Sequence, residues 1–271
     1  MGNEKISSEE FQKFAELIHR ISGIYLKESK KTLLSNRLSK RMKDLELNSF
    51  NDYYDYVISK DKEEIIEVIN GISTNETYFF RHNPHFIALF DVIIPEFISR
   101  SHFPLNIWCA GCSSGEEPYT IAMLAKERGY LNRKYIRIDA SDINTEVLNL
   151  ATHGIYDNKK FRETESGYIK KYFKQLNDKN YLIDEEIRRS VNFFRFNLIH
   201  DSTDKKYDII FCRNVMIYFD REDQNKVVAN FFKALNPEGY FFLGHAESLY
   251  FMDSGFKFKK VQDAPVYYKE W

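Results

Sequence analysis

The sequence of 271 residues is poor in cysteine and proline and contains no long uninterrupted apolar run. Its three cysteines, Cys109, Cys112 and Cys212, are too few and odd in number for a disulfide framework, so a reducing compartment and a cytoplasmic location are expected. No apolar stretch is long enough for a membrane-spanning helix, and the charged start MGNEKISSEEF lacks the apolar run of a signal peptide. We therefore expect no direct membrane insertion.

Neither sign of charge is in excess, because 39 lysines and arginines accompany 40 aspartates and glutamates. This balance gives no overall support for binding to nucleic acid or to an anionic membrane. The hydrophobic fraction of 43% is sufficient for a packed core, and the length favours two unequal domains.

Apolar residues recur at helical spacing from Ser7 to about Gly71, with breaks at Gly23, Asn48 and Asp61. We predict a small all-α domain over residues 1–72, followed by a linker and connecting helix over 73–104. The apolar positions are Phe11, Phe14, Ile18, Ile21, Leu34, Leu38, Met42, Leu45, Ile65, Ile66 and Ile69.

Beyond residue 105 the pattern changes to short apolar runs that alternate with helices expected to begin near Glu116, Asn144 and Asp223. Buried strands separated by helices predict a parallel sheet covered on both faces, which is a doubly wound α/β domain over residues 105–271. The last two runs, FKFKKV and PVYYKEW, have no helix between them and should form an antiparallel hairpin. Such a terminal hairpin is typical of class I methyltransferases.

The first strand ends in WCAGCSSGEEPYT, where Gly111 and Gly115 bracket a tight turn into a helix. Glycines let the backbone approach a ligand closely. Glu116 and Glu117 occupy the helix N-terminus, which repels a phosphate but suits the sulfonium and ammonium groups of S-adenosylmethionine (SAM). The alternative is that both glutamates only complement the helix dipole, and for Glu116 the two interpretations are equally good.

Asp142 closes the second strand, where an acidic residue accepts hydrogen bonds from two ribose hydroxyls. Capping of the next helix by Asp142 is the alternative. Cys109 and Cys112 form a CxxC pattern, but Cys109 lies within a strand and no proline follows Cys112, so we reject a redox pair. Cys212 is interpreted as a small core residue.

Five segments of the chain are TNETYFFR (74–81), AGCSSGEEPYT (110–120), ASDI (140–143), FNL (196–198) and FCRNVMIYF (211–219). Together they resemble the CheR family of chemotaxis receptor methyltransferases, and the resemblance spans nearly the whole chain. The resemblance implies a Rossmann-like class I SAM-dependent methyltransferase with an all-α N-terminal domain and a small inserted β subdomain at about 168–192. The chain departs from the usual pattern at Cys109 and at Ser113-Ser114, where the side chains stay small.

The resemblance also implies a site, in which Glu117 and Asp142 bind the methionine and ribose portions of SAM. Arg81 and Tyr218 are implied at the catalytic centre; without the family, Arg81 is a solvated side chain or an interdomain ion pair. Arg213 and Asn214 also follow a strand, at the edge where open α/β sheets bind ligands. The implied cofactor-binding set is Asn75, Thr77, Arg81, Gly111, Glu117, Asp142, Asn197, Leu198, Arg213 and Asn214.

The chemistry implied is methyl transfer to glutamate carboxylates of bacterial chemoreceptors, which yields methyl esters and S-adenosylhomocysteine. A carboxylate with a pKa of about 4.3 is already a nucleophile at neutral pH and requires no general base. Accordingly, no Ser/His/Asp set or metal-ligand cluster is visible, and the histidines are interpreted as scattered. Catalysis is then expected from in-line alignment and desolvation, with Arg81 in partial contact with the substrate carboxylate and Tyr218 assisting orientation.

Seven basic residues lie between Lys27 and Lys43 against the single acid Glu28. In the family this helix is thought to dock on the receptor's helical bundle, so the predicted docking residues are Lys30, Arg37, Lys40 and Arg41. A solvated face and nucleic acid are the competing explanations, and no interleaved aromatics support the latter. Some family members bind a receptor tail through a glycine-containing loop of the β subdomain. The stretch QLNDKN has no glycine, so binding independent of a tail is predicted.

A catalytically silent SAM-binding signalling adaptor is the alternative function, since fold does not dictate function. A small-molecule or nucleic-acid methyltransferase is a third, without an identifiable lid or base-flipping pocket. We expect a monomer. The sequence leaves open which receptor and which glutamates are modified.

Overall fold

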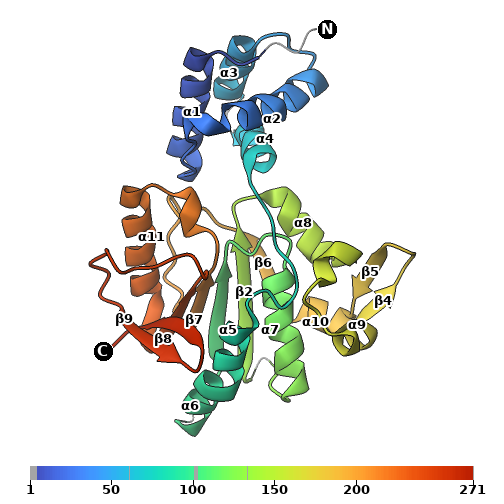
Figure 1. The fold of residues 1–271 in the computed structure, drawn as a ribbon, viewed down its shortest axis with the longest axis vertical. Coiled ribbons are helices and arrows are strands. Elements are labelled where there is room, and N and C mark those ends of the chain that lie inside the picture. The colour runs from blue at the N-terminus through green and yellow to red at the C-terminus, as the bar shows by residue number, and fades with distance from the viewer. Residues whose placement is uncertain (1–4, 61, 101–102, 133, 271) are drawn as a thin grey trace.

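The computed structural model describes residues 5–60, 62–100, 103–132 and 134–270 of the chain, so the predicted break at Asp61 lies outside it. The N-terminal helices form one body above an α/β domain, and a single extended segment joins the two (Figure 1). No helix in these ranges is long and apolar enough to cross a membrane.

The N-terminal body contains four α-helices packed around one apolar core, as the helical spacing predicts. Ser7 caps the first helix in a reciprocal pair with Glu10, because each side chain bonds the other residue's backbone N–H. The core includes the buried side chains of Phe14, Leu38 and Tyr53. The helices are α1 (Ser8–Ser22), α2 (Lys31–Asp44), α3 (Phe50–Ser59) and α4 (Lys62–Ile72), with a short 3₁₀ turn at Glu28–Lys30 before α2.

The α/β domain is built on a seven-stranded sheet in the order β6-β2-β1-β7-β8-β10-β9. The first five of these strands are parallel, and the C-terminal pair forms the predicted antiparallel hairpin, with β10 also antiparallel to β8. The fold is therefore the predicted class I methyltransferase type. The strands are β1 (Leu105–Ala110), β2 (Ile136–Asp142), β6 (Val191–Arg195), β7 (Tyr207–Cys212), β8 (Leu235–Leu243), β9 (Lys257–Val261) and β10 (Ala264–Tyr268).

Alternate residues of the central strands feed two separate cores, one on each face of the sheet. Cys109 and Phe211 belong to the core beneath the helices α5 to α8, whereas Trp108, Ile210 and Cys212 belong to the core beneath α11. All three cysteines are buried and free, as expected for small core residues. The helices are α5 (Asn83–Ala88), α6 (Ile94–Ser99), α7 (Glu116–Glu127), α8 (Thr145–His153) and α11 (Arg221–Ala234); a π-helical stretch at Leu89–Ile93 joins α5 to α6.

Two predicted boundaries are corrected. The helix expected from Asp223 begins at Arg221, because Asp220 is its N-cap and accepts from the Asp223 N–H at 2.9 Å. The inserted sheet has the order β3-β5-β4 and starts before 168, because three-residue β3 (Ile155–Asp157) pairs with β5 (Asn180–Ile183). A three-residue strand is too short for its alternation to be recognised in sequence.

The insertion also contains β4 (Phe173–Gln175) and the short helices α9 (Ser166–Tyr172) and α10 (Glu185–Arg189). Asn177 closes the turn between β4 and β5, since its side-chain oxygen accepts from the backbone N–H groups of Lys179 and Asn180.

The two domains are held together by backbone and side-chain contacts rather than by the linker alone. The Tyr25 N–H donates to the Tyr218 carbonyl at 2.8 Å, and Asn70 at the end of α4 bonds the start of α8. Gly23 ends α1 in the left-handed conformation, where an added Cβ would lie 2.5 Å from Ile199 Cγ1. The N-terminal body is thus tightly seated on the carboxyl ends of the sheet strands.

Candidate functional site

The turn after β1 wraps around the carboxylate of Asp142 at the end of β2. Asp142 accepts from the Ser113 N–H at 2.8 Å and from the Asn144 N–H at 2.9 Å. Burial raises the pKa of Asp142, and the backbone N–H groups that face it oppose this shift. The N-cap of α8 is Asn144, which accepts from the Val147 N–H, so the capping role considered for Asp142 is wrong.

Gly111 has a structural reason for being glycine that the sequence does not reveal. Its φ is +76°, and an added Cβ would lie 2.4 Å from Val215 Cγ2. Gly115 has a φ of +90° and would meet the Cβ of Ala151 at 2.9 Å. Both glycines therefore allow close packing of the loops that border the site.

Glu116 and Glu117 have different surroundings although they are neighbours. The Glu116 side chain is fully buried and is bound by Ser114 Oγ and by Lys160 Nζ at 2.8 Å. Glu117 faces Arg213, whose Nη1 lies 2.9 Å from Glu117 Oε2. Burial raises the pKa of Glu117 and lowers that of Arg213, while their attraction opposes both shifts. Only Glu117 lines the cavity described below.

The loop after β7 is fixed by Glu247, a residue that sequence reasoning missed. Asn214 has a left-handed φ of +61°, and its N–H donates to Glu247 Oε2 at 2.7 Å. The Gly244 N–H donates to the same oxygen at 2.6 Å, and an added Cβ at Gly244 would collide with it. The available signal is an acid just beyond the strand GYFFL, where ligand-facing loops of this fold begin.

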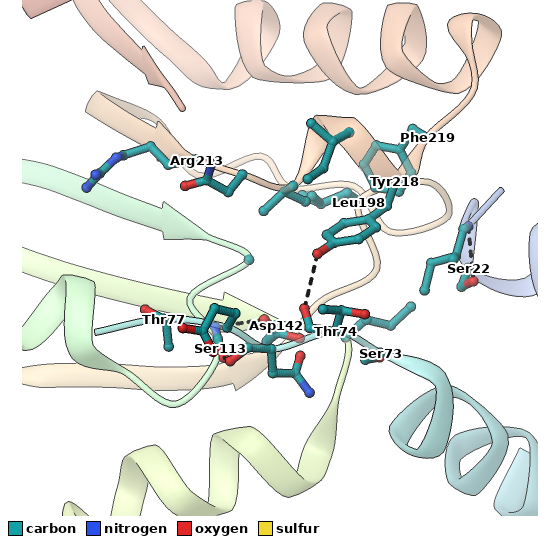
Figure 2. A pocket seen from close by; sticks show the side chains of 18 of the residues that line it. Ser22, Ser73, Thr74, Thr77, Ser113, Asp142, Leu198, Arg213, Tyr218 and Phe219 are labelled. Carbon is teal, nitrogen blue, oxygen red and sulfur yellow. Dashed lines mark hydrogen bonds between the residues drawn. The ribbon is translucent and has the colours of Figure 1, made fainter. Parts of the chain in front are cut away.

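Tyr218 and Arg81 both donate hydrogen bonds to backbone carbonyls of the linker. The Tyr218 hydroxyl donates to the Thr74 carbonyl at 3.4 Å (Figure 2), and burial raises its pKa. Arg81 Nη1 donates to the Glu76 carbonyl at 2.9 Å, and its backbone carbonyl accepts from Arg213. The catalytic pair implied by the resemblance thus borders the segment that joins the domains.

These groups line one cavity of about 780 Å³ between the two domains. Figure 2 shows Asp142, Ser113 and Thr77 along its lower wall, Arg213 and Tyr218 above, and Ser22 at the N-terminal-domain side. A cavity of this size is large enough for a cofactor-sized ligand. All of the predicted cofactor-binding residues line it, together with Tyr218: Asn75, Thr77, Arg81, Gly111, Glu117, Asp142, Asn197, Leu198, Arg213 and Asn214.

Asn197 reaches the cavity wall, but its side-chain amide is used elsewhere. Its Nδ2 donates to the Ile21 carbonyl at 2.8 Å, and its Oδ1 accepts from the Ile199 N–H at 3.0 Å. The amide therefore connects the α/β domain to the end of α1.

The four predicted docking residues divide into two kinds. Lys30 and Lys40 are exposed, and Lys30 lines the cavity. Arg41 instead pairs with the buried Glu64 at 2.7 Å, and Arg37 donates to the carbonyls of Ile72 and Ser73. The pairing raises the pKa of Arg41. The two arginines thus hold α2 against α4 and the linker, because their hydrogen-bond partners belong to the same chain.

The histidines are less scattered than the sequence suggests. The rings of His82 and His245 stack with centroids 5.7 Å apart, and buried His85 lies beside His82. Burial and the nearby Arg213 lower the pKa of His85 to about 3.

His19 Nε2 lies 3.0 Å from Asp220 Oδ2 and 3.1 Å from Asp223 Oδ2. Their ligand atoms are close enough to hold a metal ion, a juxtaposition that the sequence did not suggest. The three residues also bring α1 into contact with the start of α11.

Family models match both parts of the chain. The CheR methyltransferase all-alpha domain matches residues 9–73, and the CheR methyltransferase SAM binding domain matches residues 75–264. The chain belongs to the CheR methyltransferase family. It is accordingly a methyltransferase with SAM as its cofactor, as the resemblance in the motifs implied.

Relatives of similar length cover almost the whole of this CheR-family chain. A chemotaxis protein methyltransferase of Borreliella burgdorferi is 38% identical over 257 residues, which are 91% of this chain and 90% of the relative. Chemotaxis protein methyltransferase 2 of Vibrio cholerae is 35% identical over 277 residues, or 99% of this chain and 96% of the relative. Among solved structures, the N-methyltransferase NodS of Bradyrhizobium japonicum, bound to S-adenosylhomocysteine, is 14% identical with a TM-score of 0.33 over 56% of this chain and 57% of that chain.

Proposed function

We propose that this protein transfers the methyl group of SAM to glutamate carboxylates on the cytoplasmic helical bundle of a chemoreceptor, and so forms glutamate methyl esters. The observation that carries the proposal is the cavity between the two domains. Its inner end has the buried acid Asp142 and the largely buried acid Glu117, and its outer wall has the cation Lys30. One end suits a cationic cofactor and the other suits an acidic protein. The names of the relatives, chemotaxis protein methyltransferases, point to the same substrate class.

The inner end fits SAM by its chemistry. The Asp142 carboxylate faces the backbone N–H groups of Ser113, Ile143 and Asn144, which occupy at most three of its four acceptor positions and leave one for a ribose hydroxyl. Glu117 is a carboxylate partner for the ammonium group of the methionine portion. Asn214 Oδ1 is buried and has no hydrogen-bond partner among the described residues, so it is an acceptor available to a ligand donor. The bound cofactor supplies the methyl group as an electrophile.

The residues of this chain orient the substrate carboxylate and exclude water from it. Tyr218 and Arg81 lie where the linker borders the cavity, and we assign them to orienting the incoming carboxylate. A full salt bridge with Arg81 would weaken the nucleophile, so a partial contact that strengthens in the transition state is the better arrangement. Exclusion of water from the carboxylate by the surrounding walls strengthens these interactions.

Docking is assigned to the exposed cations of α2 and its entry. Lys30 and Lys40 are free to meet acidic residues of a receptor helix, whereas Arg37 and Arg41 brace the domain. The short β4–β5 turn supports binding without a receptor tail. A monomer suffices for this arrangement, because a single chain provides both walls of the cavity.

The deciding experiment is transfer of labelled methyl groups from SAM to a chemoreceptor cytoplasmic fragment, followed by mild alkali. We expect label on the fragment that alkali releases as methanol, because methyl esters are alkali-labile. Label that resists alkali contradicts carboxyl methylation. Absence of label together with measurable SAM binding identifies the silent adaptor instead.

A further inference from the structure

The loop that follows β8 carries the two most exposed large hydrophobic side chains in the described part of the chain. Tyr250 and Phe251 are each 83% exposed, and their rings pack edge-to-face with centroids 4.9 Å apart. Single exposed apolar residues are common on protein surfaces, but two adjacent aromatic rings make a contiguous patch that water solvates poorly. The patch is therefore a candidate contact surface.

The loop bearing this pair is well anchored. Leu249 is buried in the core beneath α11, and its N–H donates to the Tyr267 hydroxyl at 2.9 Å. The Met252 N–H donates to the Leu249 carbonyl at 2.8 Å, which closes a turn around the two aromatic residues. The rings are thus presented outward by a fixed backbone, which lowers the entropy lost on binding.

The loop is also continuous with the catalytic end of the molecule. Glu247 near its start holds the backbone of Asn214, a cavity residue. Arg221, next to the cavity residue Asp220, donates to the Phe251 carbonyl at its far end. Ile217, 56% exposed, lines the cavity between these two attachment points. The aromatic pair therefore belongs to the same side of the α/β domain as the cavity entrance.

We propose that Tyr250 and Phe251 form a second docking surface for the substrate protein, which contacts the receptor helix face beside the target glutamate. The proposal rests on the proposed function. The charge of the surroundings supports this occupant, because Arg221 accompanies the aromatic pair and Lys27 and Lys30 line the opposite wall, a combination that suits an acidic amphipathic helix. The substrate is then held between the two domains, with the cavity in the middle.

The test compares the double variant Tyr250→Ser/Phe251→Ser with wild type in steady-state methylation of the receptor fragment. We expect KM for the fragment to rise about tenfold, with kcat and the Kd for SAM unchanged, because aromatic anchors dominate binding at such surfaces. The matched control is Phe258→Ser on β9, another exposed aromatic at the far edge of the sheet, which should leave KM unaltered. A fall in kcat at constant KM, or an equal effect of the control, overturns the proposal.

A photocrosslinking residue in place of Tyr250 separates failure of docking from failure of the proposed function. Crosslinks to a fragment that is bound but not methylated support the docking surface and contradict the proposed reaction. Methylation of the fragment without crosslinks from position 250 contradicts the docking surface but not the proposed reaction. If wild type neither binds nor methylates the fragment, both are overturned.

Discussion

The two walls of the cavity are built on opposite principles. On the α/β side, Asp142, Glu117 and Asn214 are held by backbone N–H groups, by Arg213 and by Glu247. On the N-terminal side, Ser22 and Ile72 are buried, but the cavity is also lined by the exposed side chains of Tyr25, Lys27, Lys30 and Leu33. A small cofactor of constant shape requires a preorganised wall, whereas a protein partner is met by side chains that remain free to adjust. Substitutions on the two sides should therefore differ in size and in kind.

The largest expected effect is the removal of Arg213 from the fixed wall. Arg213→Met leaves Glu117 as a buried charge without its cation, and the free energy of unfolding should fall by about 3–5 kcal/mol. Urea unfolding measures this fall in the free energy of unfolding. The double variant Glu117→Gln/Arg213→Met should regain part of the loss, and Lys30→Met on the other wall should change stability by less than about 0.5 kcal/mol. Equal losses of stability for Arg213→Met and Lys30→Met would contradict the difference between the two walls.

The second-largest effect is expected for Asp142→Asn, which should weaken SAM binding. The amide has one acceptor oxygen where the carboxylate has two, so either the loop contacts or the ribose contact must be lost. We expect the Kd for SAM to rise about 100-fold, equivalent to about 2.7 kcal/mol. Calorimetric titration is the measurement, with exposed Asp204→Asn as the control. Unchanged SAM affinity would remove Asp142 from the binding site.

The α/β domain that carries the fixed wall should also be sensitive to acid through His85, which is buried near the wall residue Arg213. Its pKa is lowered from 6.5 to about 3 in the folded protein, so between these values the unfolded state binds the extra proton and stability falls as pH decreases. Acidification from pH 6.5 to 5 should cost about 1.6 kcal/mol through this group. His85→Phe should show a correspondingly smaller loss of stability on the same acidification. Urea unfolding at both pH values tests this.

Tyr218→Phe distinguishes orientation of the substrate carboxylate from binding of SAM by the α/β wall of the cavity. The variant loses the hydrogen bond to Thr74 and any contact of the hydroxyl with the substrate carboxylate, but no contact with the acids that face SAM. We expect kcat to fall about tenfold with SAM affinity retained. Full turnover would exclude Tyr218 from the catalytic centre.

The smallest effect on activity is expected for the exposed lysines of the N-terminal body. Lys30→Gln/Lys40→Gln should raise KM for the receptor fragment about threefold at low salt, and the difference should disappear at high salt, since exposed charges are screened. Lys233→Gln/Lys257→Gln is the control, because both lysines are exposed and belong to α11 and β9. A salt-independent effect would point to lost packing rather than charge.

The features that the sequence predicted well depend on local pattern. The glycine turn, Asp142 at a strand end and the terminal hairpin each follow from residues close together in the chain. What it missed depends on distant partners. Glu247 acts on Asn214, 33 residues earlier, and Arg41 is occupied by Glu64, 23 residues later. A periodicity shows which side of a helix is basic, but it does not show which of those charges the same chain already neutralises.

Gly23 sets how closely the N-terminal body can approach the α/β domain. A side chain there would meet Ile199 at 2.5 Å and Phe219 at 3.2 Å, in a backbone conformation that already disfavours side chains. The separation of the two walls is thus limited by the absence of a single methyl group. Under the proposed function, a side chain at this position would push the exposed cations of α2 away from the cavity in which the methyl group is transferred.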